Sequence, residues 1–337
     1  MALDKRGGIL RAIGLQLAII AGTLVTVELV LRVADVRYLR LDRSERSLLY
    51  DHDPELGWFP IPNLVSKFTG LRGISANREI SVQNNSIGLR DIEHDDAPIE
   101  TILVLGDSFV WGYDVEADER LTSFLRKQLP DKRIVNAGVS GYGTDQEYLL
   151  LRRLWGRFKP DIVVLIVYYN DHLENASNSR YDGTYKPYFV WSGQAGEFRG
   201  IPVPKSRHYY FRNNPLAERS LLVRLVISAY VALRHPAIEV PDATEQLVGR
   251  MRDLVEGRGA RFVVGELDGG SLVPFLRSEN IPYVSLNELT DREDLRYPVG
   301  GGLGHWTPAG HAVAGAAILR LLRESGALAP TTSVSHN

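Results

Sequence analysis

A serine and a histidine far apart in the chain are the residues that could do chemistry together. Ser108 ends the GDS turn at 106–108, directly after the apolar run at 102–105, and His305 lies in GHWTP at 304–308. A serine hydroxyl is a weak nucleophile at neutral pH and needs a base within hydrogen-bond reach, and an imidazole with a pKa near about 6.5 is suited to that task. We therefore predict that Ser108 is a nucleophile and His305 its base, as acyl transfer requires.

Two other turns could stabilise the negative charge that forms on the substrate oxygen in such a reaction. They are NAGVSGYG at 136–143 and YND at 169–171. The amides of Ser108 and Gly141 and the side-chain amide of Asn170 could donate to the oxyanion, and each lost donor would cost about 3 kcal/mol. A simpler interpretation stays open, because Gly141 could merely permit a tight turn and Asn170 could cap its own loop.

Strands and helices alternate along the part of the chain that carries these turns. Short apolar runs predict strands at 102–105, 134–135, 162–167, 262–264 and 283–284, and helical spacing of apolar residues predicts helices at 121–129, 144–155, 247–255 and 313–321. Thr144 and Glu147 predict a capping box at the second helix. The alternation predicts an α/β fold of three layers, α/β/α, with a mostly parallel five-stranded sheet. Ligands bind beyond the carboxyl ends of such strands, so the four turns should meet at one edge.

The four turns resemble the sequence blocks of the SGNH (GDSL-like) hydrolase family. GDSF at 106–109, NAGVSGYG at 136–143, YND at 169–171 and GHWTPAGH at 304–311 occur in the order of that family's blocks. The resemblance covers about residues 101–322, and it implies the flavodoxin-like SGNH fold. It also implies that Ser108 is the nucleophile, that His305 is the base, and that Gly141 and Asn170 complete the oxyanion hole. The chain looks similar to membrane-anchored bacterial members that act on esters of cell-surface polysaccharides.

The sequence departs from the family at the acid that orients the histidine. The family usually has an aspartate two or three residues before the histidine, where this chain has Leu303 and Gly302. A backbone carbonyl or a more distant acid, Asp294 or Asp291, could orient His305 instead. The alternative is a weak enzyme, or a catalytically silent protein that binds carbohydrate or serves as a scaffold in a membrane complex. We predict a Ser–His dyad and leave its third member open.

Composition and missing motifs argue against other functions. A formal net charge of -2 offers no field for nucleic acid, and the absence of cysteine excludes disulfides and a thiol nucleophile. The chain has no GxGxxG, no GxxxxGK[ST], no HExxH and no GxSxG. We therefore predict no metal and no cofactor. The expected substrate is a small ester, foremost an O-acyl (acetyl) group on a carbohydrate, and the sequence does not separate hydrolysis from acyl transfer.

The amino terminus predicts a membrane anchor. Residues 12–31 are interrupted only by Gln16, two threonines and Glu28, and as a helix they would span about 30 Å, the thickness of a bilayer core. A cleaved signal peptide is the alternative, and basic residues on both sides leave the orientation open. We expect a single-pass anchor with an extracytoplasmic (periplasmic) catalytic domain. The predicted organisation is an anchor at 1–36, a linker and irregular or β-rich lead-in at 37–100, a catalytic domain at 101–325 with an insertion at about 172–241, and a flexible tail at 326–337.

Overall fold

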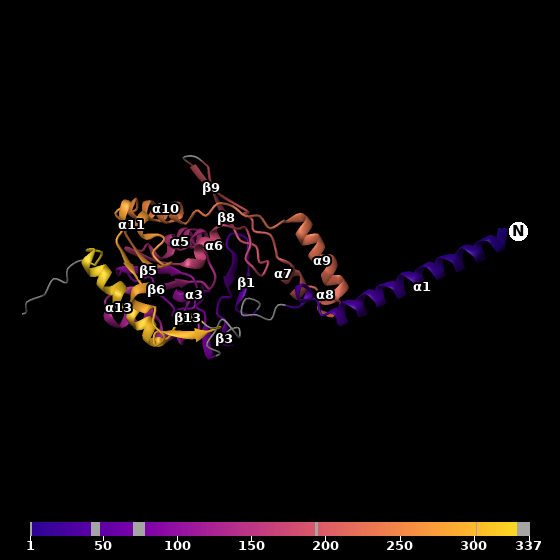
Figure 1. The fold of residues 1–337 in the computed structure, drawn as a ribbon, viewed down its shortest axis with the longest axis horizontal. Helices are drawn as coiled ribbons and strands as arrows, with labels where there is room; N and C mark the ends of the chain where they lie inside the picture. Colours follow the sequence, from indigo (N-terminus) through magenta and orange to yellow (C-terminus); the bar gives the residue numbers. More distant parts are fainter. Residues whose placement is uncertain (1, 42–47, 70–77, 193–194, 301, 329–337) are drawn as a thin grey trace, which may run out of the picture. The chain divides into compact units, whose positions relative to one another are not determined.

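The computed structural model of the protein describes residues 2–41, 48–69, 78–192, 195–300 and 302–328 (Figure 1). The chain divides into two compact units, which we describe separately: residues 44–204 with 238–337, and residues 1–43 with 205–237. Most of the predicted tail, 329–337, and residues 42–47 of the predicted linker lie outside the described residues.

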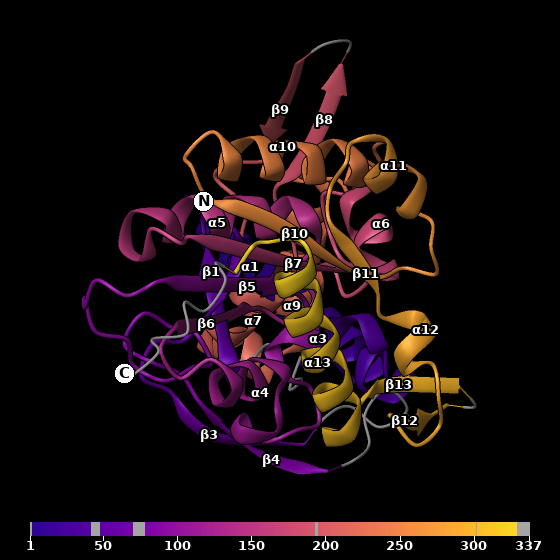
Figure 2. The ribbon, with the colours of Figure 1, turned by 90° about the vertical axis from the view of Figure 1, so that its left-hand side faces the viewer.

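The larger unit is built on a sheet of five parallel strands in the order β11-β10-β7-β5-β6 (Figure 2). Taken in chain order, the strands are arranged 2-1-3-4-5, which is the flavodoxin-like order with its switch point beside the first strand. The predicted five-stranded parallel sheet is thus confirmed. The strands are β5 (Thr101–Gly106), β6 (Arg133–Gly138), β7 (Ile162–Tyr168), β10 (Arg261–Leu267) and β11 (Tyr283–Ser285).

Helices cover both faces of this sheet (Figure 2). Alternate side chains of a strand point to opposite faces, so Leu103 and Leu105 of β5 join one apolar core while Ile102 and Val104 join the other. Burial on both faces explains why this strand reads as an uninterrupted apolar run, and the three predicted layers are confirmed. One core includes α5 (Thr144–Phe158), α10 (Thr244–Glu256) and α11 (Val273–Ser278), and the other includes α4 (Leu121–Gln128) and α13 (Pro308–Glu324).

Short elements complete the larger unit. Four antiparallel hairpins pair β1 (Tyr50–Asp53) with β2 (Gly57–Pro60), β3 (Val65–Thr69) with β4 (Glu79–Gln83), β8 (Tyr188–Ser192) with β9 (Ala195–Arg199), and β12 (Arg296–Val299) with β13 (Gly302–Trp306). The first two hairpins lie in the predicted lead-in, and Trp58, Phe68 and Val82 from them are buried in the core that includes α5. The short helices are α3 (Ser108–Trp111), η2 (Ala117–Glu119), α6 (Tyr169–Asn175) and α12 (Asn287–Thr290).

The start of α5 differs from the prediction. Gly143, not Thr144, is the N-cap residue, and the side chain of Gln146 accepts a hydrogen bond from the Gly143 amide at 3.3 Å. The predicted capping box of Thr144 and Glu147 is therefore wrong, because the N-cap lies one residue earlier, at Gly143, than the pattern implied. Glu147 consequently points into the protein and is fully buried.

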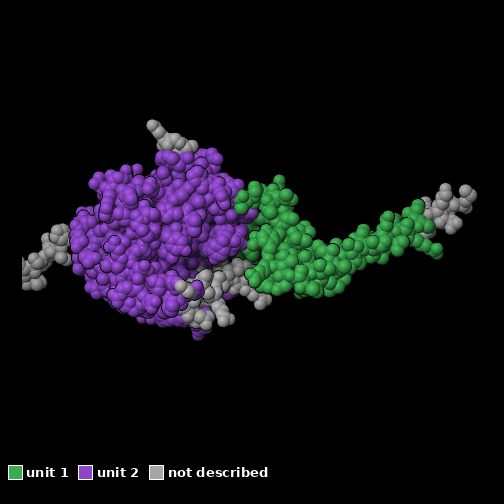
Figure 3. All heavy atoms as spheres, viewed as in Figure 1, with its two compact units in different colours: residues 1–43, 205–237 green, residues 44–204, 238–337 purple. Residues whose placement is uncertain are grey.

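The smaller unit combines the amino terminus with a later part of the chain (Figure 3). It contains α1 (Ala2–Ala34), η1 (Arg37–Leu39), α7 (Arg207–Arg212), α8 (Pro215–Arg219) and α9 (Leu221–Arg234). Within α1, residues Gly8–Ala34 reach a mean hydropathy of 2.0 over the most apolar window, none of which is buried. This helix is long and apolar enough to be a membrane anchor or a signal sequence. Residues 205–237 of the predicted insertion belong to this unit, and the rest of the insertion belongs to the larger one.

Candidate active site

The hydroxyl of Ser108 lies 2.9 Å from Nε2 of His305, within hydrogen-bond distance. Ser108 is the first residue of α3, directly beyond the carboxyl end of β5, and His305 lies in β13, just before α13. The two predicted catalytic residues, 197 positions apart in the chain, therefore meet at one edge of the sheet.

The turn around Ser108 is held by its neighbours. Asp107 is the N-cap of α3 and accepts a hydrogen bond from the Phe109 amide at 2.9 Å, while the Ser108 hydroxyl lies 3.3 Å from the same carboxylate. Gly138 at the end of β6 lets α3 pack directly on the sheet, because a Cβ there would lie 2.3 Å from the Trp111 backbone nitrogen. The position of the serine is thus set by the Asp107 carboxylate and by the close packing of α3 on the sheet.

The imidazole of His305 is enclosed by aromatic side chains. The ring of Tyr113 stacks on it with centroids 4.4 Å apart and planes 19° apart, and the ring of Phe109 lies 5.0 Å away. Burial, with a smaller contribution from the positive charge of Arg296, lowers the pKa of His305 to about 3. The imidazole is therefore neutral at neutral pH, the form in which Nε2 can accept the serine proton.

The other ring nitrogen of His305 faces Asp114. Nδ1 is buried and has no hydrogen-bond partner, and Oδ2 of Asp114 lies 3.8 Å from it. Among the described residues, Asp114 is the only one whose carboxylate lies within 4.0 Å of a ring nitrogen of His305. Asp114 is fully buried and has a backbone φ of 66°, in the left-handed region that aspartate tolerates better than most residues.

The predicted third acids lie elsewhere. Asp294 pairs with Arg292 at 2.6 Å, and Asp291 lies 3.7 Å from Arg296. Neither carboxylate is within ion-pair distance of His305, and no backbone carbonyl accepts a hydrogen bond from its Nδ1. We therefore replace Asp291 and Asp294 by Asp114 as the candidate acid. Sequence reasoning missed Asp114 because it searched close to the histidine, whereas this residue follows the nucleophile by six positions.

A buried arginine from the lead-in holds the loop that carries Asp114. The guanidinium of Arg90 donates to the carbonyls of Trp111, Gly112 and Val115 at 3.1, 2.7 and 2.9 Å. Arg90 is 1% exposed. Since these acceptors lie on both sides of Asp114, one side chain fixes the path of the backbone between α3 and η2.

The two further predicted oxyanion donors come from the neighbouring strands. Gly141 follows β6 and has a φ of 74°, and Asn170 lies in the first turn of α6, directly after β7. Both strands pair with β5, so these residues and Ser108 follow adjacent strands at the same edge of the sheet. The side chain of Asn170 hydrogen-bonds to Asp107, and its Oδ1 is buried without a partner.

Three buried carboxyl groups lie behind this edge. Burial raises the pKa of Asp107 to about 6, against hydrogen bonds that lower it. Burial and the charges of nearby acids raise the pKa values of Glu147 and Asp171 well above their ordinary range. Neighbouring buried carboxylates disfavour each other's ionisation, so this cluster favours the neutral form of Glu147 and Asp171 more strongly than water would.

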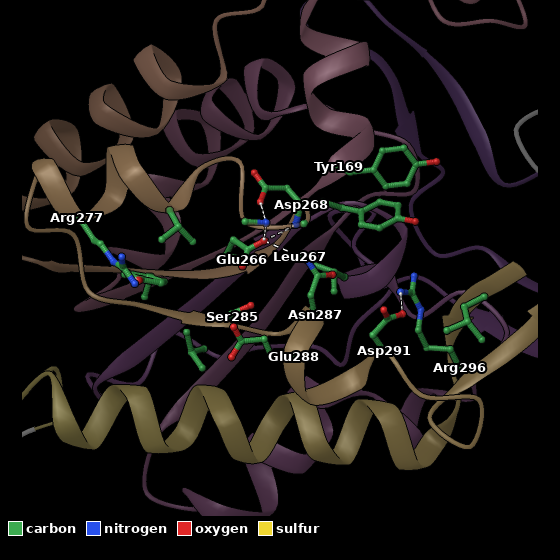
Figure 4. A pocket seen from close by; sticks show the side chains of 17 residues that line it. Tyr169, Glu266, Leu267, Asp268, Arg277, Ser285, Asn287, Glu288, Asp291 and Arg296 are labelled. Atoms are coloured by element: carbon green, nitrogen blue, oxygen red, sulfur yellow. Dashed lines mark hydrogen bonds and ion pairs between the residues drawn. The ribbon is translucent and has the colours of Figure 1, made fainter.

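A cavity of about 1090 Å³ opens beside the candidate site (Figure 4). Tyr168 and Tyr169, which precede Asn170, line it together with Arg296 and Leu303 from the hairpin that carries His305. Arg296 also donates to the Gly304 carbonyl at 2.8 Å. The rest of the lining is mainly polar and includes Glu266, Asp268, Ser285, Asn287 and Glu288.

Part of the chain matches a known family. Residues 104–266 match the model of the GDSL-like Lipase/Acylhydrolase family. None of the curated protein sequences compared with the chain matches it. Among solved structures, TesA is 16% identical over 67% of this chain and 99% of its own length, with a TM-score of 0.40.

Two further solved structures are similarly distant. The psychrotrophic esterase EstA from Pseudoalteromonas sp. is 13% identical over 67% of this chain and 98% of its own, with a TM-score of 0.39. The acetylxylan esterase Axe2 from Geobacillus stearothermophilus is 14% identical over 68% and 96%, with a TM-score of 0.35. These scores show no more than a general likeness of fold. The family match and the flavodoxin-like strand order together show that residues 104–266 resemble the GDSL-like lipase/acylhydrolase family.

Proposed function

We propose that the protein cleaves ester bonds through an acyl-serine intermediate, with Ser108 as nucleophile and His305 as base. The observation that carries this proposal is the 2.9 Å contact between the Ser108 hydroxyl and Nε2 of a neutral imidazole. The match of residues 104–266 to the GDSL-like lipase/acylhydrolase family supports it.

The proposed reaction has two balanced halves. Nε2 of His305 takes the hydroxyl proton as Oγ of Ser108 attacks the ester carbonyl carbon. The tetrahedral intermediate then collapses, the bond to the alcohol oxygen breaks, and the imidazolium returns the proton to the leaving alcohol. In the second half, His305 deprotonates water or an acceptor hydroxyl, whose oxygen attacks the acyl-serine carbonyl carbon. The bond from this carbon to Oγ of Ser108 then breaks, the imidazolium returns the proton to Oγ, and an acid or a new ester is released.

The neighbouring groups have distinct roles in this proposal. The amides of Ser108 and Gly141 and the side-chain amide of Asn170 donate to the oxyanion. The carboxylate of Asp114 orients His305 and stabilises the imidazolium that forms during each half-reaction. Its present 3.8 Å separation from Nδ1 requires a contraction of about 1 Å to a hydrogen bond, and catalytic hydrogen bonds commonly tighten on substrate binding.

The proposed substrate is an O-acyl ester of a carbohydrate, foremost an acetyl ester. The cavity beside the site supports this, because its hydrogen-bonding side chains and the half-exposed ring of Tyr169 suit a hydroxyl-rich molecule. We further propose that α1 is a retained membrane anchor and that the larger unit is extracytoplasmic, where such esters would be found.

Labelling with a fluorophosphonate tests the nucleophile. Wild type should react and Ser108→Ala should not, and hydrolysis of a model acetyl ester should be lost in Ser108→Ala and in His305→Ala. Ser271→Ala is the matched control, because the Ser271 hydroxyl also lies 3.2 Å from a histidine nitrogen, that of His172. Hydrogen bonds to Asp242 and Asp268 raise the pKa of His172 to about 10, so this imidazole is already protonated and cannot act as a base.

The control should label like wild type. Labelling of Ser108→Ala at the wild-type level would refute the mechanism, and no labelling of wild type would favour the silent carbohydrate-binding or scaffolding role. Adding sugar alcohols during turnover separates the two chemistries, because an acyltransferase forms acylated sugar whereas a hydrolase releases free acid.

A further inference from the structure

Helix α9 has the reverse of the polarity that a helix in water shows. The side chains on its outward face are apolar, and Leu225, Val226, Tyr230 and Leu233 are 39%, 62%, 54% and 85% exposed. Its inward face carries Arg224 and Ser228, which are buried, besides Val231. In a helix facing water, the apolar stripe turns inward and the charges turn outward.

The inward arginine has a specific structural role. Arg224 donates to the carbonyls of Ala217, Leu39 and Glu218. The charge is thereby satisfied inside the smaller unit, and between Leu221 and Leu233 no charged side chain of α9 is exposed. The packing of the smaller unit therefore turns the charged side chain of α9 inward and its apolar side chains outward.

The amino-terminal end of α9 is hydrogen-bonded to a residue of the apolar helix α1. The carboxylate of Glu28 accepts hydrogen bonds from the amides of Leu221 and Leu222 at 3.1 and 2.9 Å and from the Ser220 hydroxyl at 2.9 Å. Arg32 pairs with Glu28 at 2.7 Å. The first backbone donors of α9, which water would otherwise satisfy, are thus satisfied by protein, as a low-dielectric environment requires.

The position of Glu28 sets the depth of α9 relative to α1. Glu28 precedes the last residue of α1, Ala34, by six positions, which is about 9 Å along a helix. If α1 spans a bilayer and ends at its surface, the start of α9 lies where acyl chains meet headgroups. This is the depth at which apolar faces of interfacial helices are buried.

We propose that α9 is a second membrane-contacting helix, whose outward face lies in the boundary between acyl chains and headgroups beside α1. The occupant of this face is lipid, because α9 belongs to the same compact unit as the apolar α1 and its first amides bond to Glu28 of that helix. Exposed arginines at the ends of α8 and α9, Arg219 and Arg234, fit anionic headgroups, and Tyr230 is of a type enriched at this depth. The inference rests on α1 as a retained anchor, and it adds a reason for retention: cleavage after α1 would remove the carboxylate that caps α9.

The chain lends itself to a direct test, because it contains no cysteine. Full-length variants Val226→Cys and Leu233→Cys, labelled with an environment-sensitive fluorophore, are reconstituted into vesicles of phosphatidylcholine and phosphatidylglycerol. Leu17→Cys reports insertion of α1, and Glu256→Cys on the exposed face of α10 is the control in water. Lipids that carry a spin label near the headgroup end of the acyl chain should quench most of the fluorescence at 226 and 233 and little at 256.

The outcomes separate this inference from the anchor itself. Quenching at 17 but only control-level quenching at 226 and 233 would overturn the role of α9 and leave α1 as an anchor. A blue-shifted but unquenched label at 226 would also overturn it, since protein would then cover the face. No quenching at 17 would remove the anchor and this inference together.

A second variant tests the link between the two helices. Glu28→Ala in the Val226→Cys background should reduce lipid quenching, because the amides of Leu221 and Leu222 lose their acceptor while only the Ser220 side-chain cap remains. Gln16→Ala, a change of another polar side chain of α1, should not. Equal quenching in both would contradict the depth argument.

Discussion

The proposed acid and the proposed nucleophile come from one short segment of the chain. Ser108 begins α3, and Asp114 follows that helix, with Tyr113 between them stacked on the imidazole. Arg90 holds this segment through the carbonyls of Trp111, Gly112 and Val115. The imidazole of His305 lies against it.

Substitution of Asp114 by asparagine should lower kcat by about 10²- to 10⁴-fold with little change in KM, because an amide stabilises the imidazolium poorly and favours the wrong tautomer. Asparagine tolerates the left-handed backbone at this position, so the fold should persist. Asp294→Asn is the matched control and should retain wild-type kcat. Steady-state kinetics on an acetyl ester provide the measurement, and an unchanged kcat in Asp114→Asn would exclude the proposed role.

The pH dependence of the reaction should report the environment of His305. The base must be neutral, and burial together with Arg296 lowers its pKa to about 3, so kcat/KM should stay on its plateau at pH 5. An ordinary imidazole would be largely protonated there. Arg296→Gln removes one cause of the shift and should move the acid limb to higher pH, whereas Arg292→Gln should not. A wild-type limb near pH 6.5 would contradict the buried, neutral base.

At the scale of elements, α6 is the helix that positions Asn170, and an ionic cluster holds it. His172 lies in α6 and bonds to Asp242 at 2.7 Å and to Asp268 at 3.1 Å. These two carboxylates precede α10 and follow β10, respectively. The cluster therefore ties the Asn170 turn to two neighbouring elements at the same edge of the sheet.

The stabilisation from His172 should disappear in alkali. The two carboxylates raise the folded-state pKa of His172 to about 10, above the unfolded value of about 6.5. The contribution is fully present below pH 6.5 and is lost as pH rises through 10. His172→Ala should lower the free energy of unfolding by about 1–2 kcal/mol at pH 6, a modest value because the cluster is partly exposed to solvent. Denaturant melts at pH 6 and pH 10 should show the difference from wild type shrinking, and a constant difference would rule out the ionic explanation.

At the scale of the whole molecule, a second buried histidine sets the response to acid. His311 is 1% exposed, and its Nδ1 accepts a hydrogen bond from the Leu121 amide at 3.3 Å, so it links α13 to α4 in its neutral form. Burial, with nearby positive charges, lowers its pKa to about 3. Below pH 6.5 the unfolded chain therefore binds a proton at His311, whereas the folded protein leaves His311 neutral.

The free energy of unfolding should consequently fall as pH decreases from 6.5 toward 4. His311→Gln should make this slope shallower by up to about 1.4 kcal/mol per pH unit, which corresponds to the uptake of one proton on unfolding. The exposed His235→Gln serves as the control and should leave the slope unchanged. Unfolding of the full chain in detergent at several pH values provides the measurement, and equal slopes in all three proteins would show that His311 does not couple to folding.

Local pattern alone determined the α/β domain and the pairing of Ser108 with His305. Apolar runs and helical spacing are properties of neighbouring residues, and parallel strands bring their carboxyl ends to one edge, so turns that follow those strands meet without further information. The five strands and the three layers could be predicted for this reason. The capping box at Thr144 could not, since a shift of one residue in the helix start turned Glu147 into the interior.

Tertiary structure alone decided which acid faces His305 and which segments make the smaller unit. Asp114 lies 3.8 Å from the imidazole in a loop whose carbonyls bond to the buried Arg90, from a distant segment, and no local pattern encodes that contact. Likewise, the sequence of α9 predicts only an apolar helix. The tertiary structure shows that Glu28 bonds to its amino end and that Arg224 lies on its inner face. Contacts between residues far apart in the chain depend on how the elements pack, and periodicity within one element carries no record of them.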